Sequence, residues 1–165
     1  LDAATAADEA ATRLARLGAI ELALERQDGV QALQLVQRLP APVPQGLART
    51  HRLLATRAQI MAGQAAEAAQ PLQLWVADHP RDAQAWQLLS IAYTAQGQTL
   101  RAIRADAENR VAQLDFQAAL DRFKAAQELA RRPAAGGQAD HIEASIIDTR
   151  LRQVHSTLRE QASER

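Results

Sequence analysis

The stretch DAQAWQLLSIAYTAQG, residues 82 to 97, decides the fold. Its large side chains Trp86, Leu89 and Tyr93 follow one another at spacings of three and four residues. That spacing places them on one face of an α-helix. Gly97 then provides the residue type that most readily ends a helix in a tight turn. The stretch therefore predicts the first helix of a helical hairpin.

The rest of the chain has the same helical character. Hydrophobic residues make up 47% of its 165 residues but aromatic residues only 3%, a composition in which Ala and Leu favour helices. Runs rich in Pro and Gly separate the helical segments, the longest of them over residues 39–46 and 131–140. No segment shows the alternation typical of a strand. The 3.6-residue period predicts an all-α fold, one domain over residues 1–165, with about eight helices at residues 3–26, 29–38, 45–62, 65–78, 82–96, 99–113, 116–131 and 139–162.

A helical hairpin pattern recurs along the chain. Gly97 is followed five residues later by Ala102, and Gly63 is followed at the same interval by Ala68, 34 residues earlier. Large residues in a first helix and small residues in the second allow two helices to pack closely, which is the plan of the tetratricopeptide repeat. The pattern predicts a tetratricopeptide-repeat superhelix (solenoid) of three to four units, closed by a capping helix over residues 139–162. The alanines at the second-helix position are Ala32, Ala68, Ala102 and Ala119.

Three features depart from a regular repeat. Ala119 lies only 17 residues after Ala102, so the helix at 99–113 must close one unit and open the next. Pro71 lies inside a predicted helix, where a missing N–H group should cause a kink. Trp75 occupies a position that is usually small. We therefore expect an irregular superhelix.

One part of the chain resembles a narrower family. The segment AENRVAQLDFQAALDRFKAAQELA and the following ADHIEASIIDTRLRQV are similar to the C-terminal tetratricopeptide half of bacterial periplasmic zinc metallopeptidases, the β-barrel assembly-enhancing protease group. The resemblance covers residues 82–154. It implies that a peptidase domain with a zinc-binding His-Glu-x-x-His helix lies elsewhere in a longer protein, and that this chain holds no catalytic residue. The closing-helix residues that match are Ser145, Ile146, Ile147, Asp148 and Arg150.

Metal, nucleic acid and membrane partners are disfavoured. The four histidines lack the i, i+4 partner that places two ligands on one helix face, and there is no cysteine. His79, before Pro80, is expected to meet the last carbonyls of a helix. The net charge is zero with acids and bases interspersed, which does not favour a phosphate-tracking surface. No apolar run is long enough to span a bilayer. No cofactor is expected in this chain, and zinc is expected only in the separate catalytic domain.

The predicted binding surface lies on the helices that would line the inner wall of the superhelix. Its mixture of apolar side chains and arginines would suit an extended or helical peptide with some acidic character. Alternatively, the arginines only solvate a helix face or pair with local acids. The predicted groove residues are Leu53, Arg57, Ile60, Gln84, Gln87, Ile91, Thr94, Arg101, Arg104 and Glu108.

The last helix carries an apolar stripe, for which capping is favoured over a dimer or partner interface. The stripe comprises Ile142, Ile146, Ile147, Leu151, Val154 and Leu158.

These expectations lead to one functional hypothesis and its rivals. The chain is predicted to be the protein-binding module of a periplasmic zinc metallopeptidase concerned with outer-membrane protein assembly and quality control. Its partners would be assembly components or substrate proteins. The alternative is a stand-alone scaffold or assembly factor with no associated enzyme, in the periplasm or the cytoplasm. An enzyme in its own right is the third and least favoured possibility.

Overall fold

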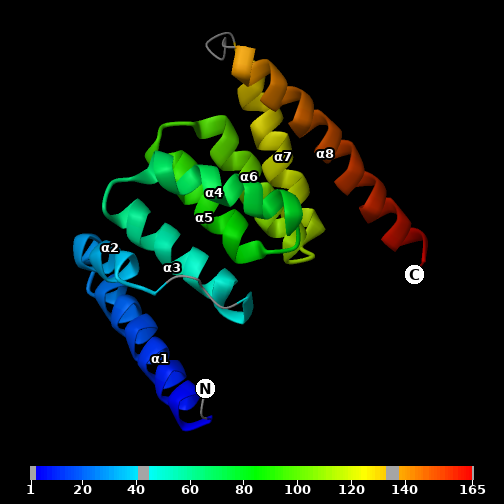
Figure 1. Cartoon of the computed structure of the whole chain (residues 1–165). Coiled ribbons are helices and arrows are strands. Elements are labelled where there is room, and N and C mark those ends of the chain that lie inside the picture. Colours follow the sequence, from blue (N-terminus) through cyan, green and yellow to red (C-terminus); the bar gives the residue numbers. More distant parts are fainter. Residues whose placement is uncertain (1–2, 41–44, 133–137, 165) are drawn as a thin grey trace. The chain divides into compact units, whose positions relative to one another are not determined.

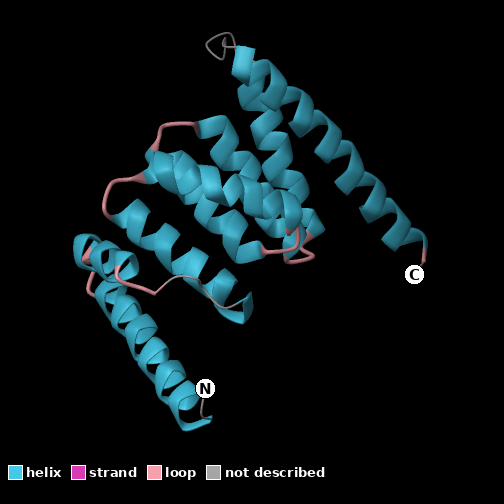
Figure 2. Ribbon diagram, viewed as in Figure 1, coloured by secondary structure: helices cyan, strands magenta, loops and turns pink. Residues whose placement is uncertain are grey.

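The computed structural model of the chain describes residues 3–40, 45–132 and 138–164. Within these ranges every regular element is a helix (Figure 2), which confirms the all-α prediction. The predicted boundaries agree to within one residue, except that a 3₁₀ turn precedes the third α-helix. The elements are α1 (Ala3–Glu25), α2 (Gly29–Gln37), η1 (Gln45–Leu47), α3 (Ala48–Met61), α4 (Ala65–Asp78), α5 (Ala83–Ala95), α6 (Thr99–Ala112), α7 (Phe116–Ala130) and α8 (Gln138–Ser163).

The chain divides into two compact units, Leu1–Ala68 and Ala69–Arg165. The boundary lies inside α4, three residues before Pro71, and α4 continues through this proline. A single repeat domain over residues 1–165 stays a prediction. The predicted Pro- and Gly-rich connections at 39–46 and 131–140 lie partly outside the described residues.

The first unit is built on α1, α2 and α3, which pack against one another (Figure 1). Its core combines large side chains of α1 with smaller contributions from α2 and α3. At the start of α2, Gly29 is buried against the end of α3, where a Cβ atom would lie 2.5 Å from the Met61 carbonyl carbon. Small residues therefore allow the close approach. The core residues are Leu17, Ile20, Ala23, Leu24, Ala32, Leu54 and Ala58.

In the second unit, α5, α6, α7 and α8 pack in succession, and α6 also packs against α8. Figure 1 shows α7 beside α8, with α6 next to α7. The helix α8 covers the outer face of α7 with Ile147 and Val154, both almost fully buried. The other members of the core cluster are Leu100, Ala107, Ala119, Leu120, Phe123 and Ala126.

Four of the turns between helices share one geometry. Each contains a residue with positive φ: Gln27 (59°), Gly63 (82°), Gly97 (70°) and Leu114 (64°). In each turn, the next N–H group bonds to the carbonyl five residues earlier, for example Gln98 N to Tyr93 O at 2.9 Å and Asp115 N to Arg110 O at 3.0 Å. This is the Schellman helix end. Sequence analysis recognised the two glycines, but not Gln27 and Leu114 as their equivalents.

The four predicted alanines occupy equivalent places after these turns. Ala32, Ala68, Ala102 and Ala119 each lie five residues beyond the positive-φ residue, and all four are buried. Each also donates its N–H to the carbonyl four residues earlier, at the start of its helix. Ala102 and Ala119 are separated by only 17 residues, half of the 34-residue repeat, because turns of the same kind both precede and follow the single helix α6. The repeat superhelix itself stays a prediction.

The corner between α4 and α5 is held by two tryptophans. The Trp75 indole donates to the Asp82 carboxylate at 2.9 Å, and the Trp86 indole donates to the Pro80 carbonyl at 3.0 Å. Asp82 also caps α5 by accepting from the N–H of Ala85. Trp75 is thus a large residue at a usually small position, where its indole N–H bonds to Asp82 and joins the end of α4 to the start of α5.

The structure places the His79 ring against a carbonyl at the end of α4, as predicted. Its ring Nδ1 lies 3.1 Å from the Trp75 carbonyl oxygen, and its ring stacks on the Trp75 indole at 3.8 Å. An imidazole that carries its proton on Nδ1 donates to this carbonyl, which also accepts the backbone N–H of His79 at 2.8 Å.

Candidate binding site

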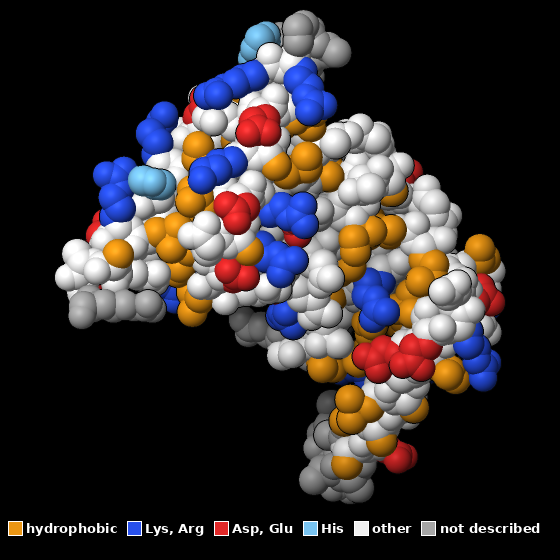
Figure 3. Space-filling model, turned by 180° about the vertical axis from the view of Figure 1, so that it is seen from behind, with side chains coloured by type: hydrophobic (Ala, Val, Ile, Leu, Met, Phe, Trp, Pro, Cys, Tyr) orange, Lys and Arg blue, Asp and Glu red, His pale blue; other side chains and the backbone are white. Residues whose placement is uncertain are grey.

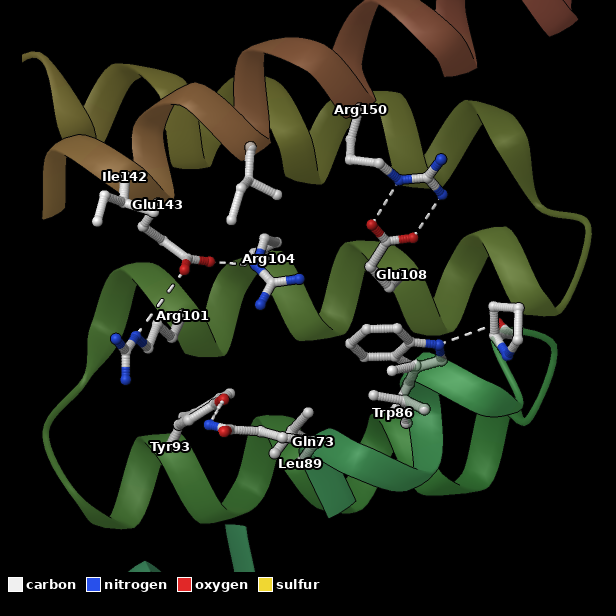
Figure 4. A pocket seen from close by; sticks show the side chains of 14 residues that line it. Gln73, Trp86, Leu89, Tyr93, Arg101, Arg104, Glu108, Ile142, Glu143 and Arg150 are labelled. Carbon is white, nitrogen blue, oxygen red and sulfur yellow. Dashed lines mark hydrogen bonds and ion pairs between the residues drawn. The ribbon is translucent and has the colours of Figure 1, made fainter. Parts of the chain in front are cut away.

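The second unit contains a hollow of about 570 Å³ bordered by α4, α5, α6 and α8 (Figure 4). We call this cavity the hollow throughout. Its volume falls within the range of about 300 to 1,000 Å³ typical of ligand sites. The residues lining it are Gln73, Val76, Ala77, Pro80, Trp86, Leu89, Tyr93, Arg101, Arg104, Glu108, Ile142, Glu143, Ile146 and Arg150.

One face of α5 forms an apolar floor. Trp86, Leu89 and Tyr93, the residues that decided the fold, all line the hollow and are buried. The Gln73 side-chain amide donates to the Tyr93 hydroxyl oxygen, and the Trp86 N–H is satisfied by Pro80. Both polar tips thus have partners within the chain, and the floor supports the more exposed side chains that lie over it.

Three ion pairs join α6 to α8 across the hollow, and two of them, Arg104–Glu143 and Arg150–Glu108, are also hydrogen-bonded. Arg104 of α6 donates to the Glu143 carboxylate of α8. In the second hydrogen-bonded pair the arginine belongs to α8 and the glutamate to α6: Arg150 donates two hydrogen bonds of 2.6 Å, from Nε and Nη2, to the Glu108 carboxylate. This bidentate bond and the negative charge of Glu108 raise the pKa of Arg150, against the opposing effect of burial. The pairs follow the same order along both helices, so α6 and α8 run parallel.

The arginines also lie over the aromatic floor. The Arg101 guanidinium is 5.9 Å from the centre of the Tyr93 ring, and that of Arg104 is 5.9 Å from the centre of the Trp86 ring. At this distance the attraction of a cation to an aromatic face contributes about 0.5 kcal/mol or more. The floor therefore helps to orient both cations.

Exposed apolar side chains complete the rim. Ile142 and Ile146, one helical turn apart on α8, are 60% and 37% exposed. The predicted apolar stripe of this helix thus divides in two. Ile147 and Val154 are buried against α7 and α6, Leu151 and Leu158 are partly buried there, and the first two isoleucines face the hollow.

The structure brings three of the predicted groove residues into this site: Arg101, Arg104 and Glu108. Thr94 lines a separate small cavity between α5 and α6 that also contains Ser90 and Asp106. The other predicted groove residues on α5 are exposed but do not line the hollow. They are Gln84, Gln87 and Ile91.

The other predicted groove residues lie on α3, in the first unit. Leu53 is 4% exposed, whereas Arg57 and Ile60 are half-buried. An apolar residue at a groove offset can equally be covered by neighbouring helices, and Leu53 is buried. The same ambiguity applies wherever a helix has neighbours on both sides.

Sequence reasoning missed two charged members of the site, Glu143 and Arg150. They lie 39 and 42 residues along the chain from Arg104 and Glu108. Arg101 and Arg104 therefore pair with an acid that is distant in sequence and not with a local one. One signal was available in the sequence. Along α6 an arginine, Arg104, precedes a glutamate, Glu108, by one turn. Along α8 the order of charges is reversed, with Glu143 two turns before Arg150.

Other kinds of site find little support in the part of the chain that the structure describes. It contains no cluster of three or more His, Asp or Glu side chains suited to a metal ion. None of its helices is both long enough and apolar enough to cross a membrane. On the face drawn in Figure 3, acidic and basic side chains are interspersed. Comparison with known proteins adds no assignment, because no family model and no curated protein matches the chain.

Proposed function

We propose that this chain is a protein-binding module of tetratricopeptide type whose hollow in the second unit receives a segment of a partner protein. The observation that carries the proposal is the exposure of Ile142 and Ile146 beside an aromatic floor. Apolar side chains that line a concave site favour binding, because covering them removes apolar surface from water. The carboxylates of Glu108 and Glu143 deeper in the site are paired with arginines of the chain.

The parallel arrangement of α6 and α8, with α7 between them in the chain, supports the tetratricopeptide assignment. Alternate helices of stacked hairpins run parallel and line one side of the stack. The shared geometry of four turns, followed each time by a buried alanine, further supports it.

The proposal extends to the whole protein through the resemblance of residues 82–154. On that basis the chain is the binding module of a periplasmic zinc metallopeptidase concerned with outer-membrane protein assembly. A stand-alone scaffold is the alternative. A His-Glu-x-x-His helix in the same polypeptide would favour the peptidase, and zinc-independent function of a protein without that helix would favour the scaffold.

Site-specific crosslinking tests the binding proposal directly. A photoreactive residue placed at Ile146 should form adducts with a defined partner when the protein is expressed in a bacterial envelope. The matched position is Ser156, which is exposed on the same helix but does not line the hollow. Equal adduct yields at the two positions, or none at either, would remove the hollow as the binding site.

A further inference from the structure

We propose that the partner segment presents an Asp or Glu side chain to Arg101, next to an apolar side chain that packs on Ile142 and Ile146. This inference rests on the proposed function and specifies the chemistry of its ligand. It also assigns the three arginines of the hollow different roles. Arg101 contacts the ligand, whereas Arg104 and Arg150 hold α8 in place.

The hollow presents cations to a ligand and hides its anions. The side chains of Arg101 and Arg150 are 37% and 31% exposed, whereas those of Glu143 and Glu108 are 6% and 8% exposed. Three arginines against two glutamates leave one net positive charge in the hollow, in a chain whose formal net charge is zero. An entering acidic group therefore meets guanidinium groups before it meets carboxylates.

Arg101 is the most exposed of the three cations and keeps N–H groups for a ligand. Arg150 commits Nε and Nη2 to Glu108 and Nη1 to Gln153, and Arg104 is only 16% exposed and paired with Glu143. Arg101 gives one hydrogen bond to Gln98 through Nη1, and its Nε forms an ion pair with the Glu143 carboxylate at 3.8 Å without a hydrogen bond. A guanidinium carries five N–H groups, so Arg101 can accommodate a carboxylate without losing a partner.

The apolar contact lies at the same end of the hollow. Figure 4 shows Arg101, Glu143 and Ile142 grouped together at one end, with Arg150 at the other. Ile146 follows Ile142 one turn along α8 and also lines the hollow. A ligand with an acidic residue and a large apolar residue close together satisfies both features, whereas a purely apolar ligand leaves the exposed guanidinium without a partner.

The test uses a displayed library of random peptides, selected on the immobilised chain in parallel with the variants Arg101→Gln, Ile146→Glu and Arg131→Gln. Arg131 is exposed beyond the end of α7 and does not line the hollow, so its variant controls for the loss of one positive charge. Circular dichroism establishes that each variant is folded. Peptides that need Ile146 should contain Asp or Glu beside a large apolar residue.

The best such peptide is then synthesised with Glu and with Gln at the acidic position. The Glu peptide should bind Arg101→Gln about tenfold more weakly than the parent, since a charge-assisted hydrogen bond contributes about that factor. Arg131→Gln should bind like the parent, and Arg101→Lys should recover part of the loss because it keeps the charge. The Gln peptide should not distinguish the parent from Arg101→Gln, and only the Glu peptide should lose affinity steeply with added salt.

The outcomes separate the two proposals. Peptides that depend on Ile146 but lack an acidic residue, or that bind Arg101→Gln as well as the parent, would overturn the role of Arg101 and leave the binding function intact. Selection of no peptide that depends on Ile146 would contradict the binding function itself, and the role of Arg101 with it.

Discussion

Arg150 and Glu108, which are 42 residues apart in sequence, form a bidentate ion pair between α8 and α6, with both hydrogen bonds 2.6 Å long. The Glu108 side chain is 8% exposed, so Arg150 takes the place of water around its carboxylate. Removing one member of a buried pair leaves the other charge uncompensated, whereas replacing both with apolar residues of similar size is often nearly neutral.

We therefore expect Arg150→Met to lower the free energy of unfolding of the second unit by about 2 kcal/mol. The double variant Glu108→Met with Arg150→Met should recover most of that loss. Urea unfolding followed by tryptophan fluorescence measures both, because Trp75 and Trp86 lie in this unit. A double variant as unstable as Arg150→Met alone would contradict the explanation that the uncompensated charge of Glu108 causes the loss of stability.

Leu114 provides a second test. It adopts a φ of 64° in the turn between α6 and α7, the conformation that Gly97 adopts in the turn before α6, and it is 74% exposed. Leu114→Gly should stabilise the second unit by about 1 kcal/mol, because a left-handed conformation strains a side chain and little apolar burial is lost. Gly97→Ala should have the opposite effect. Thermal unfolding that ranks Leu114→Gly below the parent would show that the leucine makes a compensating contact.

The all-α character and the positions of the helices were largely predictable because local signals decide them. The period of large residues located every helix, and the alanines at 32, 68, 102 and 119 proved to be structurally equivalent. Two of the four turns were harder to recognise because Gln27 and Leu114 take the place of glycine. At these two turns the sequence feature that still indicates a new helix is the capping residue, Asp28 before α2 and Asp115 before α7.

The site was predictable only in part, because it depends on register between helices. Helical periodicity shows that Arg101, Arg104 and Glu108 share a face of α6, but two or three faces of each helix are candidates for the inner wall. Which residues of α8 lie opposite depends on the length of α7 and the connection after it. For this reason Glu143 and Arg150 were missed, and Ile142 and Ile146 were assigned with the residues that pack on α7.

A pair of glycines tests close packing in the first unit. At Gly29 an added Cβ would lie 2.5 Å from the Met61 carbonyl carbon and 2.7 Å from the Ala62 nitrogen, whereas at Gly18 it would point into open space on α1. Gly29→Ala should therefore destabilise the unit by about 1 to 3 kcal/mol, since backbone atoms must move. Gly18→Ala should stabilise it by about 0.5 to 1 kcal/mol through helix propensity. Helix content during urea unfolding measures both, and equal effects would exclude close packing at Gly29.

His51 makes the first unit sensitive to acid. Its partial burial, and secondarily the neighbouring Arg52, lower the pKa of the imidazole below its ordinary value of 6.5. The unfolded chain therefore binds this proton more readily than the folded chain, and the free energy of unfolding falls as the pH drops below 6.5. Circular dichroism during urea unfolding at about pH 7.5 and about pH 5.5 measures the loss. His51→Gln should reduce the difference between the two pH values, and His155→Gln, at an exposed position on α8, should not. If both variants keep the full difference, another group is responsible for the acid sensitivity.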